Sequence, residues 1–230
     1  MTERGLAQLT EMFAFLNDHA PHCEIVVNDW GVLALLSERW GNAFTLCLGR
    51  LLVRQHRDPM AGTVIKKQLP VFLRKKDGSF LVVVHKQPPA GYRRWVRSSY
   101  VNAPQTQRFL AAMGIHRIEL NNLVQGMSIA RLPFRKTLYT PFVQVSTTRF
   151  CPMDTRHQKL YRIDVCRREC RRQYDELNRK GAVQVLYKRG NTVFYKNEAQ
   201  EIKAQRLGFD RLVFQEVSFL SARAFRGVRP

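Results

Sequence analysis

The chain has 230 residues, of which 45% are hydrophobic, enough to bury a continuous core. No stretch reaches the roughly 18 consecutive apolar residues of a membrane-spanning helix, and Glu3, Arg4 and Glu11 interrupt the region where a signal peptide would lie. We therefore expect a cytoplasmic protein without a membrane span. Lys and Arg number 38 against 18 Asp and Glu, and the formal charge of +20 favours RNA as a partner. A basic proteome or an acidic protein partner would also explain the charge.

The first third of the chain predicts alternating helices and strands. Apolar residues at helical spacing indicate an amphipathic helix, which Pro21 stops, and a β-rich run, a second helix and another strand follow. The predicted ranges are 5–19 for the first helix, 23–27 for the strand, 30–40 for the second helix and 44–48 for the second strand. A strand, a helix and a strand in this order form a βαβ unit, so we expect parallel strands.

The alternation breaks in a basic segment at about 59–103. Residues 64–73 and 79–85 predict two strands joined by the turn 76–78, which makes the segment an antiparallel hairpin insertion. Between residues 50 and 108 there are thirteen Lys or Arg against two Asp, a local charge of +11. We expect this insertion to supply an electrostatic contact to RNA.

The alternation resumes after the insertion and continues to the end of the chain. The predicted elements are a helix at 105–113, a strand at 116–120, an extended run at 137–147, an exposed helix at 166–180, a hairpin at 183–195, a helix at 198–207 and a strand at 211–214. No linker or repeat marks a second domain. The pattern predicts an α/β fold with a parallel sheet in a single domain, 1–230, with the insertion at 59–103.

Three cysteines have the spacing of a metal site. Cys151, Cys166 and Cys170 give the pattern C-x14-C-x3-C, and on a helix the last pair would lie one turn apart on one face. Neighbouring arginines would lower the thiol pKa values and stabilise the thiolates that metals need. Iron–sulfur clusters usually take four cysteines, whereas zinc could accept His157 or Asp154 as its fourth ligand.

The other two cysteines, Cys23 and Cys47, lie in apolar strands and are interpreted as buried thiols. For a cluster, the fourth ligand would come from Cys47, a small molecule or a partner chain.

Two residues at strand ends are weak catalytic candidates, Asp29 and Arg149. Asp29 follows a strand, where barrel enzymes carry functional groups, although an Asp at this turn is more often a helix cap. Arg149 lies beside the cysteines and could bind an anionic substrate, as could Arg50 at a comparable strand end. For both arginines the alternative is a solvated surface charge.

Aromatic residues and arginines alternate in one stretch: Tyr92, Arg93, Arg94, Trp95, Arg97 and Tyr100. Bases could stack on the rings while the arginines neutralise phosphates, so Arg93, Arg94, Trp95 and Arg97 are predicted RNA-binding residues. The alternative is that the aromatic rings pack the insertion against the rest of the fold.

Several segments together resemble the collagenase-like peptidase family, peptidase family U thirty-two. They are the strand–turn–helix sequence 25–33, the stretch 48–59, the cysteine region 145–152 with Cys166 and Cys170, and residues 190–195. The resemblance implies a TIM-barrel-like fold. The first segment that can be placed belongs to the middle of that barrel, so we expect an incomplete barrel, with a partner subunit completing the site.

The resemblance also implies an activity. Better-understood relatives are similar to iron–sulfur proteins that hydroxylate RNA bases or ubiquinone precursors without oxygen, which predicts a [4Fe–4S] cluster at Cys151, Cys166 and Cys170. Zinc is the alternative metal. The alternative functions are a peptidase of the same family and a non-catalytic RNA- or protein-binding subunit. The sequence contains no Gly-x-Ser-x-Gly and no His-Glu-x-x-His motif, so metal-dependent oxidation fits its reactive residues better than proteolysis.

Overall fold

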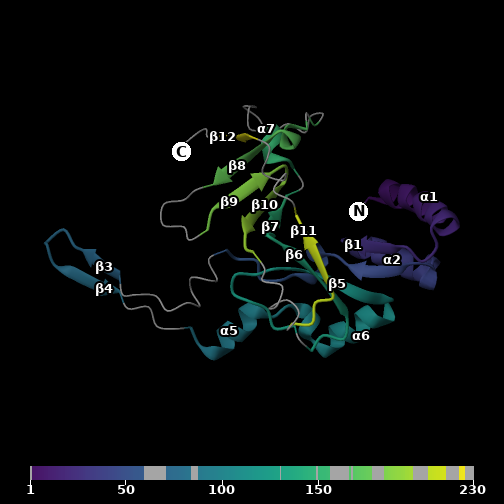
Figure 1. The fold of residues 1–230 in the computed structure, drawn as a ribbon, viewed down its shortest axis with the longest axis horizontal. Helices are drawn as coiled ribbons and strands as arrows, with labels where there is room; N and C mark the ends of the chain where they lie inside the picture. Colours follow the sequence, from purple (N-terminus) through teal and green to yellow (C-terminus); the bar gives the residue numbers. More distant parts are fainter. Residues whose placement is uncertain are drawn as a thin grey trace.

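Two five-stranded sheets and a separate two-stranded hairpin form the β-structure of this chain (Figure 1). The structure is a computed structural model that describes residues 2–59, 71–83, 88–129, 131–148, 150–155, 166, 168–177, 184–198, 207–215 and 223–225. The first large sheet is parallel and the second is mainly antiparallel. The chain is therefore a mixed α/β protein.

The parallel sheet has its strands in the order β1-β2-β5-β6-β11, and every neighbouring pair is parallel. Its strands are β1 (Glu24–Val27), β2 (Thr45–Leu48), β5 (Ile115–Asn121), β6 (Arg135–Thr140) and β11 (Arg211–Phe214). The spatial order follows the chain without the reversal that defines a doubly wound sheet. The sheet is a half-barrel, consistent with the predicted incomplete barrel.

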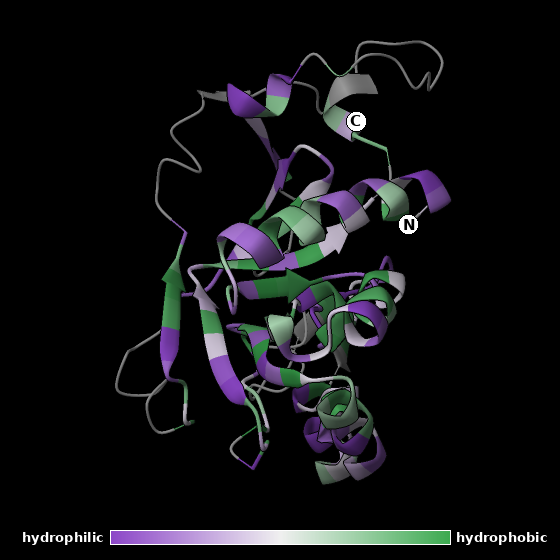
Figure 2. Cartoon of the chain, turned by 90° about the vertical axis from the view of Figure 1, so that its right-hand side faces the viewer, coloured by the Kyte–Doolittle hydropathy of each residue, from purple (hydrophilic) through white to green (hydrophobic). Residues whose placement is uncertain are grey.

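Helices cover one face of this sheet and bury the main core. They include α1 (Glu3–His19), α2 (Trp30–Arg39) and α6 (Pro104–Ala112). Apolar residues of these helices and of the strands form one buried cluster that contains Phe13, Leu33, Leu36, Leu46, Leu48, Leu110, Ile118, Leu120 and Leu138. Figure 2 shows hydrophobic residues concentrated in the strands, with hydrophilic residues on the outer faces of the helices. None of the described helices is long and apolar enough to cross a membrane.

Short helical segments connect these elements. They are η1 (Gly41–Ala43), α3 (Arg50–Val53), η2 (Tyr100–Asn102) and α7 (Pro152–Thr155).

The second sheet has the order β12-β8-β9-β10-β7. Its strands are β7 (Phe142–Thr147), β8 (Gln173–Leu177), β9 (Leu186–Arg189), β10 (Thr192–Lys196) and β12 (Arg223–Phe225). The predicted hairpin is confirmed as β9 and β10, and Gly190 supplies the positive φ of 62° at its turn. The run predicted as extended at 137–147 is confirmed as two strands on either side of Pro141. Pro141 separates β6 from β7, and the two strands belong to different sheets.

Amide side chains join the two sheets at the carboxyl ends of the parallel strands. Asn122 and Asn197 each donate from the side-chain amide to the other's backbone carbonyl, at 2.8 and 2.7 Å. The backbone N–H of Gln144 on β7 donates to Asn121 Oδ1 at 3.3 Å. The second sheet is therefore fixed at the edge where parallel α/β sheets carry functional side chains.

The predicted basic insertion contains both the hairpin and a helix. Strands β3 (Val71–Arg74) and β4 (Phe80–Val83) pair antiparallel, as predicted, and Asp77 accepts hydrogen bonds from the backbone and hydroxyl of Ser79 in the turn. Figure 1 shows the hairpin standing away from the two large sheets. The helix α5 (Ala90–Arg97) was not predicted, and it packs beside the main body rather than in the hairpin.

The predicted helix at 166–180 was wrong. Its described residues form the short helix η3 (Glu169–Arg171) and then β8, which pairs with β9 and is tied to it by an ion pair between Asp175 and Lys188 of 2.8 Å. Pairing across the sheet overrides the weak helical preference of this polar segment. The helix predicted at 198–207 lies almost entirely outside the described residues.

Candidate functional site

Polar side chains occupy the face of the parallel sheet opposite the helices. Along β5, Ile118 and Leu120 face the buried apolar cluster, whereas Arg117, Glu119 and Asn121 alternate with them and are also buried. Successive side chains of a strand point to opposite faces. The half-barrel is therefore apolar toward its helices and polar on its other face.

Four of these polar groups meet near the carboxyl ends of β2, β5 and β6. The Tyr139 hydroxyl donates to Glu119 Oε1 at 2.6 Å, and the Arg50 guanidinium lies 3.9 Å from the centre of the Tyr139 ring. Arg50 Nη1 also donates to Asn121 Oδ1 at 3.2 Å. These contacts fix a cation, a carboxyl and a phenol in one cluster.

Burial favours the neutral forms of the Glu119 carboxyl and the Tyr139 hydroxyl beside Arg50. Burial raises the pKa of the Glu119 carboxyl, and the hydrogen bond from Tyr139 and the charge of Arg50 only partly offset this effect. Burial also raises the pKa of the Tyr139 hydroxyl, as do its hydrogen bond to Glu119 and the charge of that residue. Perturbed carboxyl groups of this kind occur often at functional sites.

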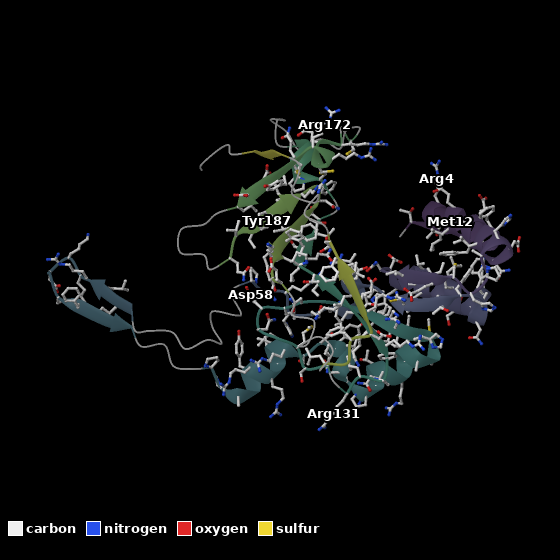
Figure 3. All side chains as sticks on the ribbon, in the orientation of Figure 1. Arg4, Met12, Asp58, Arg131, Arg172 and Tyr187 are labelled. Atoms are coloured by element: carbon white, nitrogen blue, oxygen red, sulfur yellow. The ribbon has the colours of Figure 1, made fainter. Side chains whose placement is uncertain are left out.

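The segment after α3 crosses the end of β5 and is held by side-chain amides. Gln55 accepts from the backbone N–H of Asn121 at 2.7 Å and donates to its carbonyl at 3.3 Å. Gln125 donates to the carbonyl of His56 at 2.6 Å. Asp58, whose charge acts on Tyr195 of β10, ends this segment near the second sheet (Figure 3). Arg57 therefore directly follows His56, a residue that Gln125 holds in place.

An ion-pair network closes the other end of the polar face. Both terminal nitrogens of Arg117 donate to the two carboxylate oxygens of Asp210, at 2.7 and 2.9 Å, and Arg117 Nε lies 3.4 Å from Glu24. Arg211 pairs with Glu24 as well, at 2.5 Å. Only 6% of the Arg117 side chain is exposed, so these partners compensate a buried charge. This network is structural.

The two predicted catalytic residues have different outcomes. Asp29 is the N-cap of α2, where its carboxylate accepts from the backbone N–H groups of Gly31 and Val32 at 2.9 and 3.2 Å. Asp29 therefore has the capping role that the sequence analysis gave as the alternative. A catalytic role for Asp29 stays a prediction. Arg149 lies outside the described residues, as does the predicted metal ligand His157.

Two of the three predicted metal ligands lie on elements that touch. Cys151 immediately precedes α7, and α7 packs against η3, which carries Cys170. A Cβ added to Gly190 would lie 3.6 Å from Cys170 Sγ, and the N–H of Gly190 donates to Met153 Sδ at 2.9 Å. Figure 3 shows sulfur atoms near Arg172 at this end of the molecule. Soft sulfur donors around one glycine fit the chemistry of a thiolate metal site.

The third predicted ligand, Cys166, is exposed and accepts from the backbone N–H of Arg168 at 3.4 Å. Arg168, two residues before Cys170, has a left-handed backbone and precedes the 3-10 helix η3, so Cys166 and Cys170 do not lie on one face of an α-helix. Among the described residues, no three His, Cys, Asp or Glu side chains form a metal-binding group. The metal site stays a prediction.

Cys47 fits the role of a fourth metal ligand poorly. It is fully buried in β2, away from the elements that carry Cys151 and Cys170, and burial raises the pKa of its thiol to about 12. A thiol with this pKa stays protonated at neutral pH, whereas a metal binds the thiolate. Cys47 is therefore the buried thiol that the sequence predicted.

The predicted RNA-binding residues all lie on α5. Arg93, Arg94 and Arg97, with Ala90 and Ser128, line a hollow of about 450 Å³. Trp95 is 55% exposed and Tyr92 39%, so neither ring is packed away in the core. Tyr100 differs, because it packs against Trp30 with ring centres 6.4 Å apart. The structure brings the four predicted residues together on one helix.

Residues that sequence reasoning missed are Glu119, Asn121, Tyr139 and Arg57. A usable signal was present in β5, because Arg117, Glu119 and Asn121 alternate with the apolar residues Ile118 and Leu120. That pattern indicates a strand with one polar face. No comparable local signal marks Arg57.

No family model, curated protein or solved structure matches this chain. The fold and its polar face define an α/β protein with a half-barrel parallel sheet and a cationic, aromatic surface at the carboxyl edge of that sheet.

Proposed function

We propose that this chain binds single-stranded RNA through α5 and acts on it as a metal-dependent oxidoreductase. The observation that carries the RNA proposal is the exposed ring series beside the arginine-lined hollow. Trp95 lies between His56, with ring centres 4.0 Å apart, and Tyr92, with ring centres 5.9 Å apart. Exposed rings next to cations are the common basis of sequence-tolerant single-strand binding.

The position of α5 supports the proposal. The backbone and side chain of its last residue, Arg97, bond to the loop after β5: its carbonyl accepts from Ser128 N–H at 2.8 Å, and its Nε donates to the Gln125 carbonyl at 2.7 Å. His56 belongs to the segment that begins with Arg50. RNA stacked on Trp95 would therefore lie at the carboxyl edge of the parallel sheet, beside the polar cluster.

Filter binding with a single-stranded RNA oligomer at several salt concentrations tests the RNA proposal. We expect affinity to fall steeply as salt rises, and Trp95→Ala to weaken binding by about 1–3 kcal/mol. Arg94→Gln should reduce the salt slope by about 1. Matched controls are Phe15→Ala, an exposed ring on α1, and Arg4→Gln, an exposed cation on α1.

Two results would contradict this part of the proposal. One is an absence of RNA binding even at low salt, in which case the +20 charge serves an acidic protein partner. The other is equal weakening by the α5 variants and the α1 controls, which would indicate binding through net charge alone.

The oxidoreductase part is supported by the packing of α7 on η3 and by the resemblance of the cysteine region to the U thirty-two family. Cys151, Cys166 and Cys170 would hold an iron–sulfur cluster, which when bound supplies one-electron redox chemistry. The resemblance implies oxygen-independent hydroxylation, of RNA or of a quinone precursor. RNA is the proposed substrate, because the stacking surface lies at the carboxyl edge of the sheet.

Anaerobic purification, followed by iron, sulfide and zinc analysis and a visible absorption spectrum, tests the metal site. We expect Ala substitutions of Cys151, Cys166 and Cys170 to lower the metal content, and Cys23→Ala to leave it unchanged as the control. Detection of zinc without sulfide would indicate a zinc site in place of the predicted cluster. A wild-type protein with neither metal, or three variants with unchanged metal content, would overturn the site.

A further inference from the structure

Arg50 is held at the carboxyl end of β2, and within the described part of the chain its guanidinium makes one hydrogen bond. Gly49 lets this turn approach β1, since a Cβ there would collide with the side chain of Asn28, and Asn28 Oδ1 accepts from the N–H of Leu51 at 3.1 Å. A guanidinium has five N–H donors. Among the described residues, Arg50 donates to the amide oxygen of Asn121 and lies over the ring of Tyr139, and the charge of Glu119 acts on it.

Arg57 is a second guanidinium in the same region, and it is poorly compensated. Its Nη1 is buried and has no hydrogen-bond partner within the described part of the chain. Arg50 and Gln55, two residues before Arg57, both bond to Asn121, which brings the two arginines to the same strand end. Burial lowers the pKa of Arg57, and the positive charge of Arg50 lowers it further. Burial also lowers the pKa of Arg50.

Two neighbouring, desolvated guanidinium groups are unfavourable unless an anion lies between or beside them. The surrounding structure nevertheless fixes both. Gln55 is bonded to the backbone of Asn121 and His56 to the side chain of Gln125, so the chain on the N-terminal side of Arg57 has little freedom to turn it toward solvent. Charged side chains that stay desolvated and poorly compensated in a well-held segment are characteristic of ligand sites.

The chemistry of the two side chains selects the ligand. Arginine presents paired N–H donors that match phosphate oxygens, and two arginines together match a group with about two negative charges. Phosphate sites recur at the carboxyl edges of parallel barrel sheets. Glu119 offsets the positive charge of the pair only in part, because burial raises the pKa of its carboxyl and so favours the neutral form.

We propose that Arg50 and Arg57 form a binding site for a phosphate group at the carboxyl edge of the parallel sheet. The phosphate is supplied by a nucleotide monoester or by the backbone of an RNA strand. Neither arginine lies on α5, so the binding of phosphate can be measured separately from the proposed RNA binding.

Thermal unfolding of the full chain in increasing inorganic phosphate tests this site, with chloride at matched ionic strength as the reference. We expect a saturable rise of Tm in wild-type protein and its loss in Arg57→Gln. Arg54→Gln is the matched control, because Arg54 is exposed on the same segment and its substitution removes the same positive charge. Arg50→Lys keeps the charge but not the paired donors, and should weaken the phosphate response at least tenfold in midpoint concentration.

A second measurement guards against a folding defect in the variants. In phosphorus NMR, the phosphate line should broaden with wild-type and Arg54→Gln protein. It should stay narrow with Arg57→Gln protein, whose circular dichroism is first shown to match that of wild type. Trp95→Ala should keep the full phosphate response even where it loses RNA. If a nucleoside monophosphate competes with phosphate more strongly than an RNA oligomer does, the natural ligand is the monoester. If the RNA oligomer competes more strongly, the natural ligand is the RNA backbone.

The proposal is overturned if Arg57→Gln keeps the saturable phosphate effect. It is also overturned if phosphate acts no differently from chloride, or if Arg54→Gln loses the effect to the same degree as Arg57→Gln.

Discussion

The ion pair between Arg117 and Asp210 should be a main contributor to the stability of the parallel sheet. Arg117 projects from β5, and Asp210 immediately precedes β11 and also accepts from the backbone N–H of Lys136 at 3.1 Å. The bidentate contact thus joins the central strands to the edge strand. Asp210→Asn keeps the shape of the side chain but turns one acceptor into an amide donor that faces the guanidinium.

The expected loss follows from the burial of Arg117. Its side chain is 6% exposed, and the substitution would remove one of its two acceptors at position 210 while the Thr137 hydroxyl at 3.1 Å and the Glu24 carboxylate at 3.4 Å remain. Leaving a buried charged group short of a partner costs about 2–3 kcal/mol. For a chain of this size that loss lowers Tm by about 4–12 °C. Because the Asp210 side chain is 43% exposed, the loss of unfolding free energy should be smaller than for a fully buried ion pair.

Urea unfolding of Asp210→Asn, Arg117→Met and the double variant measures this contribution. The double variant should lose less stability than the two single losses combined, because the pair is removed together. Glu198→Gln is the control, since its ion pair with Lys196 is exposed on both sides and should contribute about 0–1 kcal/mol. Equal losses in Asp210→Asn and Glu198→Gln would refute the reasoning.

The pH dependence of the same variant gives an independent check. Burial alone would raise the pKa of Asp210, but the hydrogen bonds and charge of Arg117 outweigh it and hold the pKa below its usual value. A carboxylate with a lowered pKa stabilises the fold above the unfolded pKa of about 3.9, and this contribution is lost as pH falls. The stability difference between wild type and Asp210→Asn should therefore shrink below about pH 4.

Three further predictions follow from the polar face. Arg57→Met should stabilise the ligand-free protein by about 1–3 kcal/mol in urea, since it removes a buried donor without a partner; a destabilised variant would contradict this. Because burial raises the pKa of Glu119, its carboxyl contributes less to stability as pH rises above its unfolded pKa of about 4.3. Glu119→Gln should therefore gain stability relative to wild type as pH rises from there, and a constant difference would refute this. Cys47 should resist alkylation in the native protein while Cys166 reacts, as mass spectrometry of the labelled peptides would show; equal labelling would contradict its burial.

Local sequence patterns were sufficient for the first part of the fold. The apolar spacing of α1, the stop at Pro21 and the Asp29 cap before α2 are all signals within one turn or one strand. The parallel pairing of β1 and β2 then follows from their connection through a helix. These elements were predicted to within a few residues because their preferences are set by near neighbours.

Local patterns misled where distant pairing decides the structure. The arginine-rich segment after Cys166 has no strong apolar period, and β8 forms there because β9 offers it a partner strand. The continuous run from β6 to β7 gave no sign that the two strands enter different sheets, and α5 was hidden inside a segment interpreted as a hairpin. Strand pairing depends on contacts that are remote in sequence.

The sequence by itself determined the α/β class, the basic character of the chain and the grouping of Arg93, Arg94, Trp95 and Arg97, because composition and close spacing set these properties. The tertiary structure alone decided that Arg50, Glu119 and Tyr139 meet, and that Arg57 lies buried beside a second cation. Those side chains come from strands and loops up to 89 positions apart in the chain, between Arg50 and Tyr139. Only the register of a folded parallel sheet brings such residues to one edge, since each strand end is placed by its neighbours rather than by its own sequence.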